Sequence, residues 1–353
     1  MRHPIASGLA LRHRSLTLLI ALGLALALPT ASHAARGGTW TIERGRAHDA
    51  VRLTWRYQDE HSRESSSRSL DVRHLEGLEP RALAAERTDA SFRVRRDAGT
   101  FRFEGVLANG RGGGDWTFEP DSRFGEGLAR RGYEPPSEEI QFRLGLRDIG
   151  FDYVDELARQ GYERPATRTL VRMADHGVDL EYLRGMGRLG QRLGDVDLLT
   201  TMRDHGVDPN YVEALERAGY HHVVAQELLR ARDHGVDAAF VEALGPMLHA
   251  LPLAEWVTLR DHGVDPQYAN GLRELGLDDL GPATLVRLRD HGVDPQFVRD
   301  LVAAGFPHLS ADQLQRARDH GVDGRYARRV RARIQGRLTI DEVIRLRDRG
   351  VDW

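Results

Sequence analysis

The pentapeptide Asp-His-Gly-Val-Asp occurs six times in this chain of 353 residues, and consecutive copies begin 28 or 29 residues apart. Each copy carries one imidazole and two carboxylates, which are groups that bind zinc and other divalent ions. A divalent metal is therefore the one cofactor that the sequence suggests. The candidate ligands are His176, His205, His234, His262, His291 and His320.

Three interpretations of this row are open. As an ion site, each copy would need an Asp from its neighbour, because packed helices lie roughly 10 Å apart. As a structural device, each His would sit at a helix C-terminus, where the negative end of the helix dipole favours it. The third is a pH-responsive edge, since His titrates at about pH 6.5. In the structural interpretation the Asp before each His is unfavourable, and we expect it to pair with an Arg of the adjacent repeat, drawn from Arg203, Arg232, Arg260, Arg289 and Arg318.

The regular spacing predicts a stacked-repeat architecture. Degenerate copies of the motif at 148–152 and 348–352 extend the series, and they bound seven units of about 29 residues. Each unit has the signals of two helices. In the copy at 204–208, Gly206 is placed to end one helix in the left-handed conformation, and Val207 to contact Met202. Asp208 is then placed to cap the next helix, with Pro209 at its first position.

Two stretches depart from this regularity. Gly185, Gly187 and Gly190 weaken the helix expected after Asp179. Gly245, Pro246 and Pro252 are expected to break the helix after Asp237, where the motif spacing also drops to 28, because proline removes an intrahelical hydrogen bond. We expect local bends at both places.

Residues 37–120 have a different pattern, in which apolar and polar residues alternate as in half-buried strands. This predicts an antiparallel meander of about five strands, with a short helix over 80–85. We expect an exposed loop at Ser65-Ser66-Ser67. We also expect a chain reversal marked by Asn109-Gly110 and the run Gly112-Gly113-Gly114, with the triple glycine as a hairpin tip. The predicted fold class is thus α+β: a small antiparallel β-rich domain at 37–120, then an all-α tandem-repeat solenoid at 121–353.

The first 34 residues predict a signal peptide. Arg2, Arg12 and Arg14 precede a short apolar run, and Ser32-His33-Ala34 suits cleavage after Ala34. We expect an exported protein, periplasmic or extracellular in a Gram-negative-type bacterium, with an uncleaved anchor as the alternative. The absence of cysteine excludes disulfides and thiol chemistry. A formal charge of −3 favours no polyanionic partner, so nucleic acid is not expected.

A run of arginines near the end of the chain is a candidate partner surface. It would meet anionic lipid headgroups or an acidic partner, or it is simply a solvated helix face. Its residues are Arg325, Arg328, Arg329, Arg331 and Arg333, with Arg337 beyond them.

The repeat pattern L-x-x-[LA]-R-D-H-G-V-D-P-x-[FY]-V resembles a known group of repeats. These are the extracytoplasmic helical repeats at the C-terminus of some bacterial beta-lactam-sensor-type membrane metallopeptidases, and those of stand-alone exported proteins. The stretch from Arg96 to Gly105, with Phe118-Glu119-Pro120, is similar to the block before those repeats. The resemblance implies architecture and compartment. It implies no protease activity, because the chain has no His-Glu-x-x-His and the peptidase part is absent.

These observations favour an exported, non-enzymatic binding or scaffold protein that uses its helical-repeat surface to meet a protein partner. One alternative, from the resemblance, is a regulatory or sensory accessory of an envelope-stress metallopeptidase system. A second is a repeat protein that binds divalent metal along the Asp-His-Gly-Val-Asp edge. An enzyme would need converging carboxylates or histidines in a pocket of the β-rich domain or its junction with the array.

Overall fold

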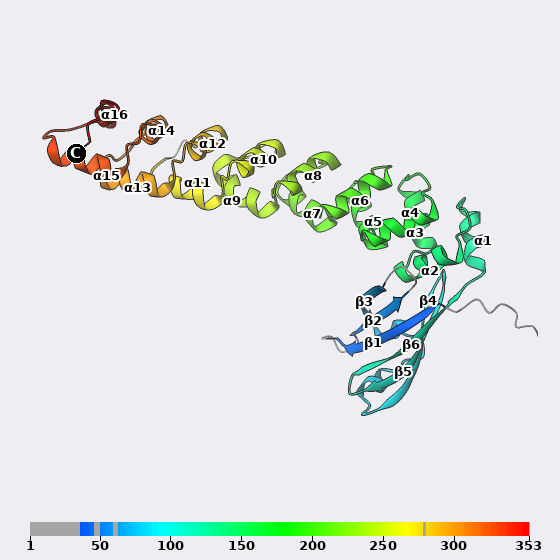
Figure 1. Cartoon of the computed structure of the whole chain (residues 1–353). Helices are drawn as coiled ribbons and strands as arrows, with labels where there is room; N and C mark the ends of the chain where they lie inside the picture. Colours follow the sequence, from blue (N-terminus) through cyan, green and yellow to red (C-terminus); the bar gives the residue numbers. More distant parts are fainter. Residues whose placement is uncertain (1–35, 46–49, 59–62, 278–279, 353) are drawn as a thin grey trace, which may run out of the picture.

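The computed structural model describes residues 36–45, 50–58, 63–277 and 280–352. An antiparallel sheet of six strands is followed by helices that run to the end of the chain, which confirms the predicted α+β class (Figure 1). The predicted signal peptide lies outside the described residues. None of the helices in the described part of the chain is both long and apolar enough to cross a membrane.

The sheet differs from the predicted five-strand meander in both strand number and connectivity. Its spatial order is β3-β2-β1-β6-β5-β4, so the first strand pairs with the last. The alternating pattern located residues of β2, β4, β5 and β6, but strand order depends on which apolar faces meet, and that is not a local property. The strands are β1 (Gly37–Arg44), β2 (Ala50–Gln58), β3 (Arg63–Asp71), β4 (Thr88–Arg96), β5 (Gly99–Ala108) and β6 (Arg111–Pro120).

Two predicted loops are strand residues instead. Ser65–Ser67 lie in β3, paired with β2. The three glycines Gly112–Gly114 lie inside β6, between β1 and β5, and the actual tip is Asn109-Gly110. A side chain is sterically excluded there, because a Cβ on Gly114 would lie 2.0 Å from the carbonyl oxygen of Glu104. The predicted short helix exists as a 3₁₀ helix, η2 (Pro80–Ala84), after a shorter one, η1 (Val72–His74).

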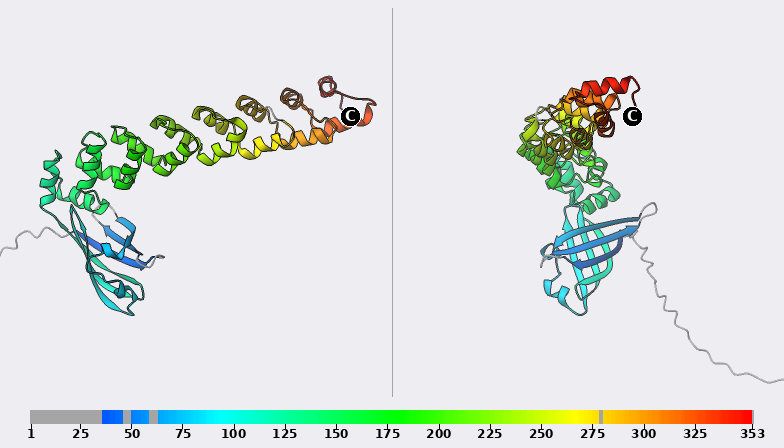
Figure 2. Two further views of the ribbon diagram at one scale, coloured as in Figure 1. Left: turned by 180° about the vertical axis from the view of Figure 1, so that it is seen from behind. Right: turned by 90° about the vertical axis from the view of Figure 1, so that its left-hand side faces the viewer.

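The helices from α3 onward form two rows that run side by side along a gently curved rod (Figures 1 and 2). Odd-numbered helices contact each other in succession from α3 to α15, and even-numbered ones do so from α8 to α16. The helices are α1 (Arg123–Arg130), α2 (Glu138–Arg147), α3 (Phe151–Arg159), α4 (Thr167–Asp175), α5 (Leu180–Arg188), α6 (Val196–Asp204), α7 (Pro209–Arg217), α8 (Ala225–Asp233), α9 (Ala238–Leu248), α10 (Leu253–Asp261), α11 (Pro266–Arg273), α12 (Pro282–Asp290), α13 (Pro295–Ala303), α14 (Ala311–Asp319), α15 (Gly324–Arg333) and α16 (Ile340–Asp348).

The pentapeptide forms the turn from an even-numbered helix to the next odd-numbered one, as predicted. At the end of α6, Gly206 has a φ of 74°. The amide of Val207 donates to Met202 at 2.8 Å, and that of Gly206 donates to Arg203 at 3.1 Å. Asp208 then accepts from the amide of Tyr211 at 2.9 Å and caps α7. The valine that follows each of these glycines is fully buried, which anchors the turn in the core: Val178, Val207, Val236, Val264, Val293 and Val322.

The two irregular stretches remain helical. Helix α9 continues through Pro246, so the predicted break is wrong, because losing one intrahelical bond does not end a helix whose Phe240 and Leu244 are buried. Helix α5 accommodates Gly185 and Gly187. A Cβ on Gly185 would lie 2.5 Å from Pro209 of the next repeat, so the glycine permits close packing between repeats.

Helix α2 joins the sheet to the array. Phe142 packs among the sheet aromatics, with its ring 5.4 Å from that of Phe118. Buried Gln141 donates to the carbonyl oxygens of Ala98 and Asp121 at 2.7 and 2.8 Å. Asp97, in the β4–β5 turn, accepts from the first amide of α3 at 2.7 Å. Asp97 and Ala98, in the β4–β5 turn, therefore link the sheet to α2 and α3.

The left-handed glycine of the turn makes a first prediction. Gly206→Ala should lower the free energy of unfolding by about 1–2 kcal/mol, because a Cβ strains this conformation. Gly125→Ala is the matched control. Gly125 lies in α1 without positive φ, and its added Cβ would make an ordinary contact with Pro135 at 3.6 Å. We expect that variant to be stabilised by about 0.5–1 kcal/mol. Urea unfolding measures both, and equal stabilities would contradict the assignment.

Candidate functional site

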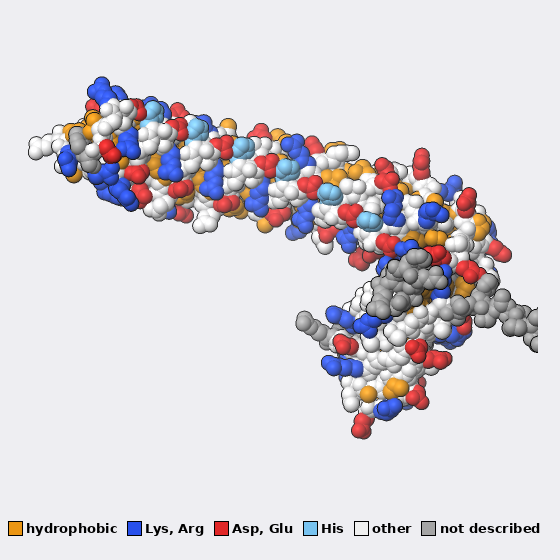
Figure 3. Space-filling view, in the orientation of Figure 1, with side chains coloured by type: hydrophobic (Ala, Val, Ile, Leu, Met, Phe, Trp, Pro, Cys, Tyr) orange, Lys and Arg blue, Asp and Glu red, His pale blue; other side chains and the backbone are white. Residues whose placement is uncertain are grey.

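The six predicted histidines form a row along one side of the array (Figure 3). The Nδ1–H of each histidine donates to a carboxylate oxygen of the first Asp in the next copy of the motif. The pairs are His176–Asp204 at 2.8 Å, His205–Asp233 at 2.6 Å, His234–Asp261 at 2.5 Å, His262–Asp290 at 2.8 Å, His291–Asp319 at 2.7 Å and His320–Asp348 at 2.6 Å. We call this row of six pairs the His–Asp ladder.

The ladder corrects the predicted partner of the Asp. We expected an Arg of the adjacent repeat. Asp175, in the first copy, does pair with arginines of α2, but the first Asp of each later copy accepts from a His instead. The acceptors Asp204, Asp233, Asp261, Asp290, Asp319 and Asp348 were not identified as such from the sequence. The signal that could have found them is the period itself, since stacking equivalent turns sets the His of one copy beside the Asp of the next.

The arginines make a different contact. Arg289 lies over the ring of Tyr268, with its guanidinium carbon 4.7 Å from the ring centre. Equivalent cation–π contacts recur at 4.5–5.0 Å, and each would contribute about 0.5–1 kcal/mol at an exposed site. The arginines thus bind the aromatic residue of the preceding helix. The other pairs are Arg203–Tyr182, Arg232–Tyr211, Arg260–Phe240, Arg318–Phe297 and Arg347–Tyr326.

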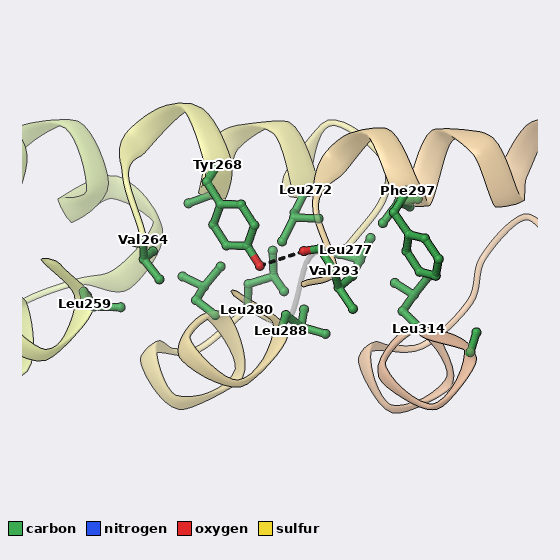
Figure 4. Packing of buried hydrophobic residues seen from close by; sticks show 14 of the residues in the cluster. Leu259, Val264, Tyr268, Leu272, Leu277, Leu280, Leu288, Val293, Phe297 and Leu314 are labelled. Atoms are coloured by element: carbon green, nitrogen blue, oxygen red, sulfur yellow. Dashed lines mark hydrogen bonds between the residues drawn. The ribbon is translucent and has the colours of Figure 1, made fainter. Parts of the chain in front are cut away.

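The same tyrosines reach the turn that follows them. The hydroxyl of Tyr268 donates to the carbonyl oxygen of Val293 at 3.0 Å (Figure 4). Burial raises the pKa of this hydroxyl far above its ordinary value, so it remains a donor. Tyr153, Tyr182, Tyr211 and Tyr326 make the same bond to Val178, Val207, Val236 and Val351. Phe240 and Phe297 stand in this position without a hydroxyl.

Both ends of the ladder carry arginine. Ile149 replaces His in the first degenerate motif, and Asp175 instead pairs with Arg143 at 3.1 Å and Arg147 at 2.7 Å. Arg349 replaces His in the last motif. The ladder therefore has defined ends, as expected for terminal repeats that differ from internal ones.

The ladder is half exposed. The side chains of its histidines are 39–44% exposed, and those of its aspartates 37–46%. Exposed pairs of this kind typically contribute about 0.2–1 kcal/mol each in double-mutant cycles. Each rung combines one imidazole with one carboxylate, and no group of three or more potential ligands suited to a metal ion occurs in the described ranges. The geometry thus explains why each motif contains His and Asp: the two side chains form a contact between neighbouring repeats.

An open groove lies beside the ladder, between α10 and α12. It has a volume of about 520 Å³. Leu259, Ala283 and Val286 form its apolar lining, while Asp290 and His291 border it. The groove therefore combines an apolar floor with the polar edge of the ladder.

A larger cavity of about 960 Å³ lies at the junction of the sheet and the array. Some of its charged side chains pair within the lining. Burial lowers the pKa of Arg96, and its ion pair with Asp148 at 3.0 Å opposes that shift. Asp121 receives Arg123 at 2.8 Å. The Arg96–Asp148 pair links the end of β4 to the C-terminus of α2.

The predicted arginine surface is divided by the structure. Arg329 pairs with Asp352 at 3.1 Å. Arg331 donates to the carbonyl oxygen of Ala304 at 3.0 Å and lies over Phe306. Arg325, Arg328 and Arg333 are exposed and make no ion pair with a described residue. Only these three of the five remain available to a partner.

Comparisons with known proteins return no match: no family model fits the chain, and neither a curated protein nor a solved structure is similar to it at a significant level.

The tyrosine contact makes a second prediction. Tyr268→Phe should lower the free energy of unfolding by about 1 kcal/mol, because Val293 loses its buried donor. Phe297→Tyr is the reciprocal change, and it should raise stability by up to about 1 kcal/mol by donating to Val322. Urea unfolding of the two variants measures both. If neither substitution changes the free energy of unfolding, the hydroxyl does not stabilise the turn and the assignment is contradicted.

Proposed function

We propose that this chain is an exported, non-enzymatic binding protein whose helical array presents a surface to a protein partner. The observation that carries the proposal is the groove between α10 and α12. The groove lies in an array whose repeats make the same contacts. Equivalent positions in neighbouring repeats therefore have the same backbone geometry. Export rests on the predicted signal peptide, which is independent of this groove.

The lining of the groove indicates the chemistry of the partner segment. Val286 and Ala283 offer apolar contact, and Arg287 at the rim is already paired with Asp312 at 2.8 Å. Asp290 accepts from His262. Glu255 also lines the groove and forms no ion pair with a described residue. A mostly apolar segment with one basic side chain opposite Glu255 therefore fits this lining better than a strongly charged one. A helix or extended strand with two or three apolar side chains would meet these requirements.

A third prediction tests the groove. Ala283 is exposed on α12, so Ala283→Arg should fold normally while filling the groove. The variant should lose the envelope proteins that the unaltered chain retains in affinity capture. Val302→Arg on α13 is the matched control, because Val302 is 39% exposed and lies outside the groove. It should retain the same proteins as the unaltered chain.

Two outcomes oppose the proposal: the unaltered chain retains no protein, or Ala283→Arg retains the same set as the control. A regulatory accessory of a membrane metallopeptidase would use the same surface. The identity of the captured protein therefore decides between a scaffold and that alternative.

A further inference from the structure

The last repeat has a charge unlike that of the rest of the chain. Residues 321–353 contain nine arginines and five acidic residues, which gives a net charge of +4. The whole chain has a formal net charge of −3. The preceding residues 1–320 therefore have a net charge of −7, and the end of the array is a separate cationic region.

The acidic residues of this repeat are all engaged. Asp323 caps α15 by accepting from the amide of Tyr326 at 2.7 Å, and Glu342 accepts from the amide of Thr339 at 2.8 Å. Asp341 pairs with Arg316, and Asp348 with His320. Asp352 pairs with Arg329 and Arg347. None of these five carboxylates forms an ion pair with Arg325, Arg328, Arg333, Arg337 or Arg349 in the described residues.

Six arginines of the repeat are exposed and form no ion pair or hydrogen bond with a described residue. Hydrogen bonds from Thr339 lower the pKa of the Glu342 carboxyl, and one of the six, Arg345, lies close enough to lower it further. We call the other five the cationic tip: Arg325, Arg328, Arg333, Arg337 and Arg349. They come from α15, from the segment after it and from the end of α16. They are thus spread over the end of the array and do not line a groove.

The tip lies at the end of the rod that is farthest from the sheet (Figures 1 and 2). Basic side chains gather there in the space-filling view (Figure 3). An end of this kind can meet an extended flat surface while the groove and the sheet stay clear of it.

We propose that the cationic tip docks the chain on a membrane surface that bears anionic phospholipids. A guanidinium group matches the phosphate oxygens of a headgroup through paired hydrogen bonds. A lipid surface needs charge but no shaped groove, which agrees with the spread of the five arginines. An acidic protein would favour a concave arrangement instead. Because the tip is separate from the groove, this proposal stands or falls independently of the partner proposed above.

A fourth prediction tests the tip with vesicles. The chain from Ala35 onward should co-sediment at physiological salt with phosphatidylcholine vesicles that contain phosphatidylglycerol, and not with pure phosphatidylcholine. Replacing four arginines of the tip with glutamine should weaken binding by about 600-fold, because each basic residue near an anionic surface contributes about fivefold. The substitutions are Arg325→Gln, Arg328→Gln, Arg333→Gln and Arg337→Gln.

The matched control removes the same charge elsewhere. It combines four exposed arginines of the array that have no ion pair in the described residues, namely Arg168→Gln, Arg188→Gln, Arg192→Gln and Arg217→Gln. This variant should bind the anionic vesicles within a few-fold of the unaltered chain. Circular dichroism establishes that both variants retain their helices.

Three results would overturn the proposal. In the first, the unaltered chain ignores the anionic vesicles. In the second, both variants lose binding equally, which would indicate overall charge and not the tip. In the third, a polyglutamate peptide binds the chain more tightly than the vesicles do and competes for the same arginines, which would assign the tip to an acidic protein.

Discussion

The architecture depends on the contact between consecutive pentapeptide turns. Each turn is fixed internally by a left-handed glycine, a buried valine and a capping aspartate, as at Gly206, Val207 and Asp208. Each is also tied to the next turn from outside by a His–Asp pair. An aromatic ring from the intervening helix lies under an arginine beside that turn. Because every repeat makes the same contact, stability should be approximately a sum of repeat and neighbour terms.

The internal chemistry of the turn could be predicted from the sequence, because helix ends obey local rules. Gly206, Val207 and Asp208 were assigned correctly for this reason. The partner of the first Asp in the motif, for example Asp204, could not be predicted from such local rules. Arg203 and His205 both stand near Asp204 in the motif, and either type of side chain can pair with a carboxylate. Which side chain pairs with Asp204 depends on the rotation of the helix about its axis. In the structure Arg203 lies over the ring of Tyr182, and the imidazole of His176, from the preceding repeat, contacts Asp204.

In the sheet, too, local features could be predicted from the sequence and contacts between distant residues could not. Alternation located residues of β2, β4, β5 and β6, but the pairing of β1 with β6 joins residues far apart in the sequence. The glycines of β6 were assigned to a turn because glycine is typical of turns. Their actual reason is the close approach of β5, which is visible only once the strands are paired. The candidate site was predictable as a row of histidines, while the groove and the tip required coordinates.

Neighbour coupling is the central claim, and a double-mutant cycle on His262 and Asp290 tests it most directly. The free energies of unfolding of His262→Ala, Asp290→Ala and the double variant should yield a coupling of about 0.2–1 kcal/mol. The same cycle on His262 and Asp319, one repeat farther on, should give a coupling near zero. A near-zero value for the first pair, or equal values for both pairs, would contradict the account.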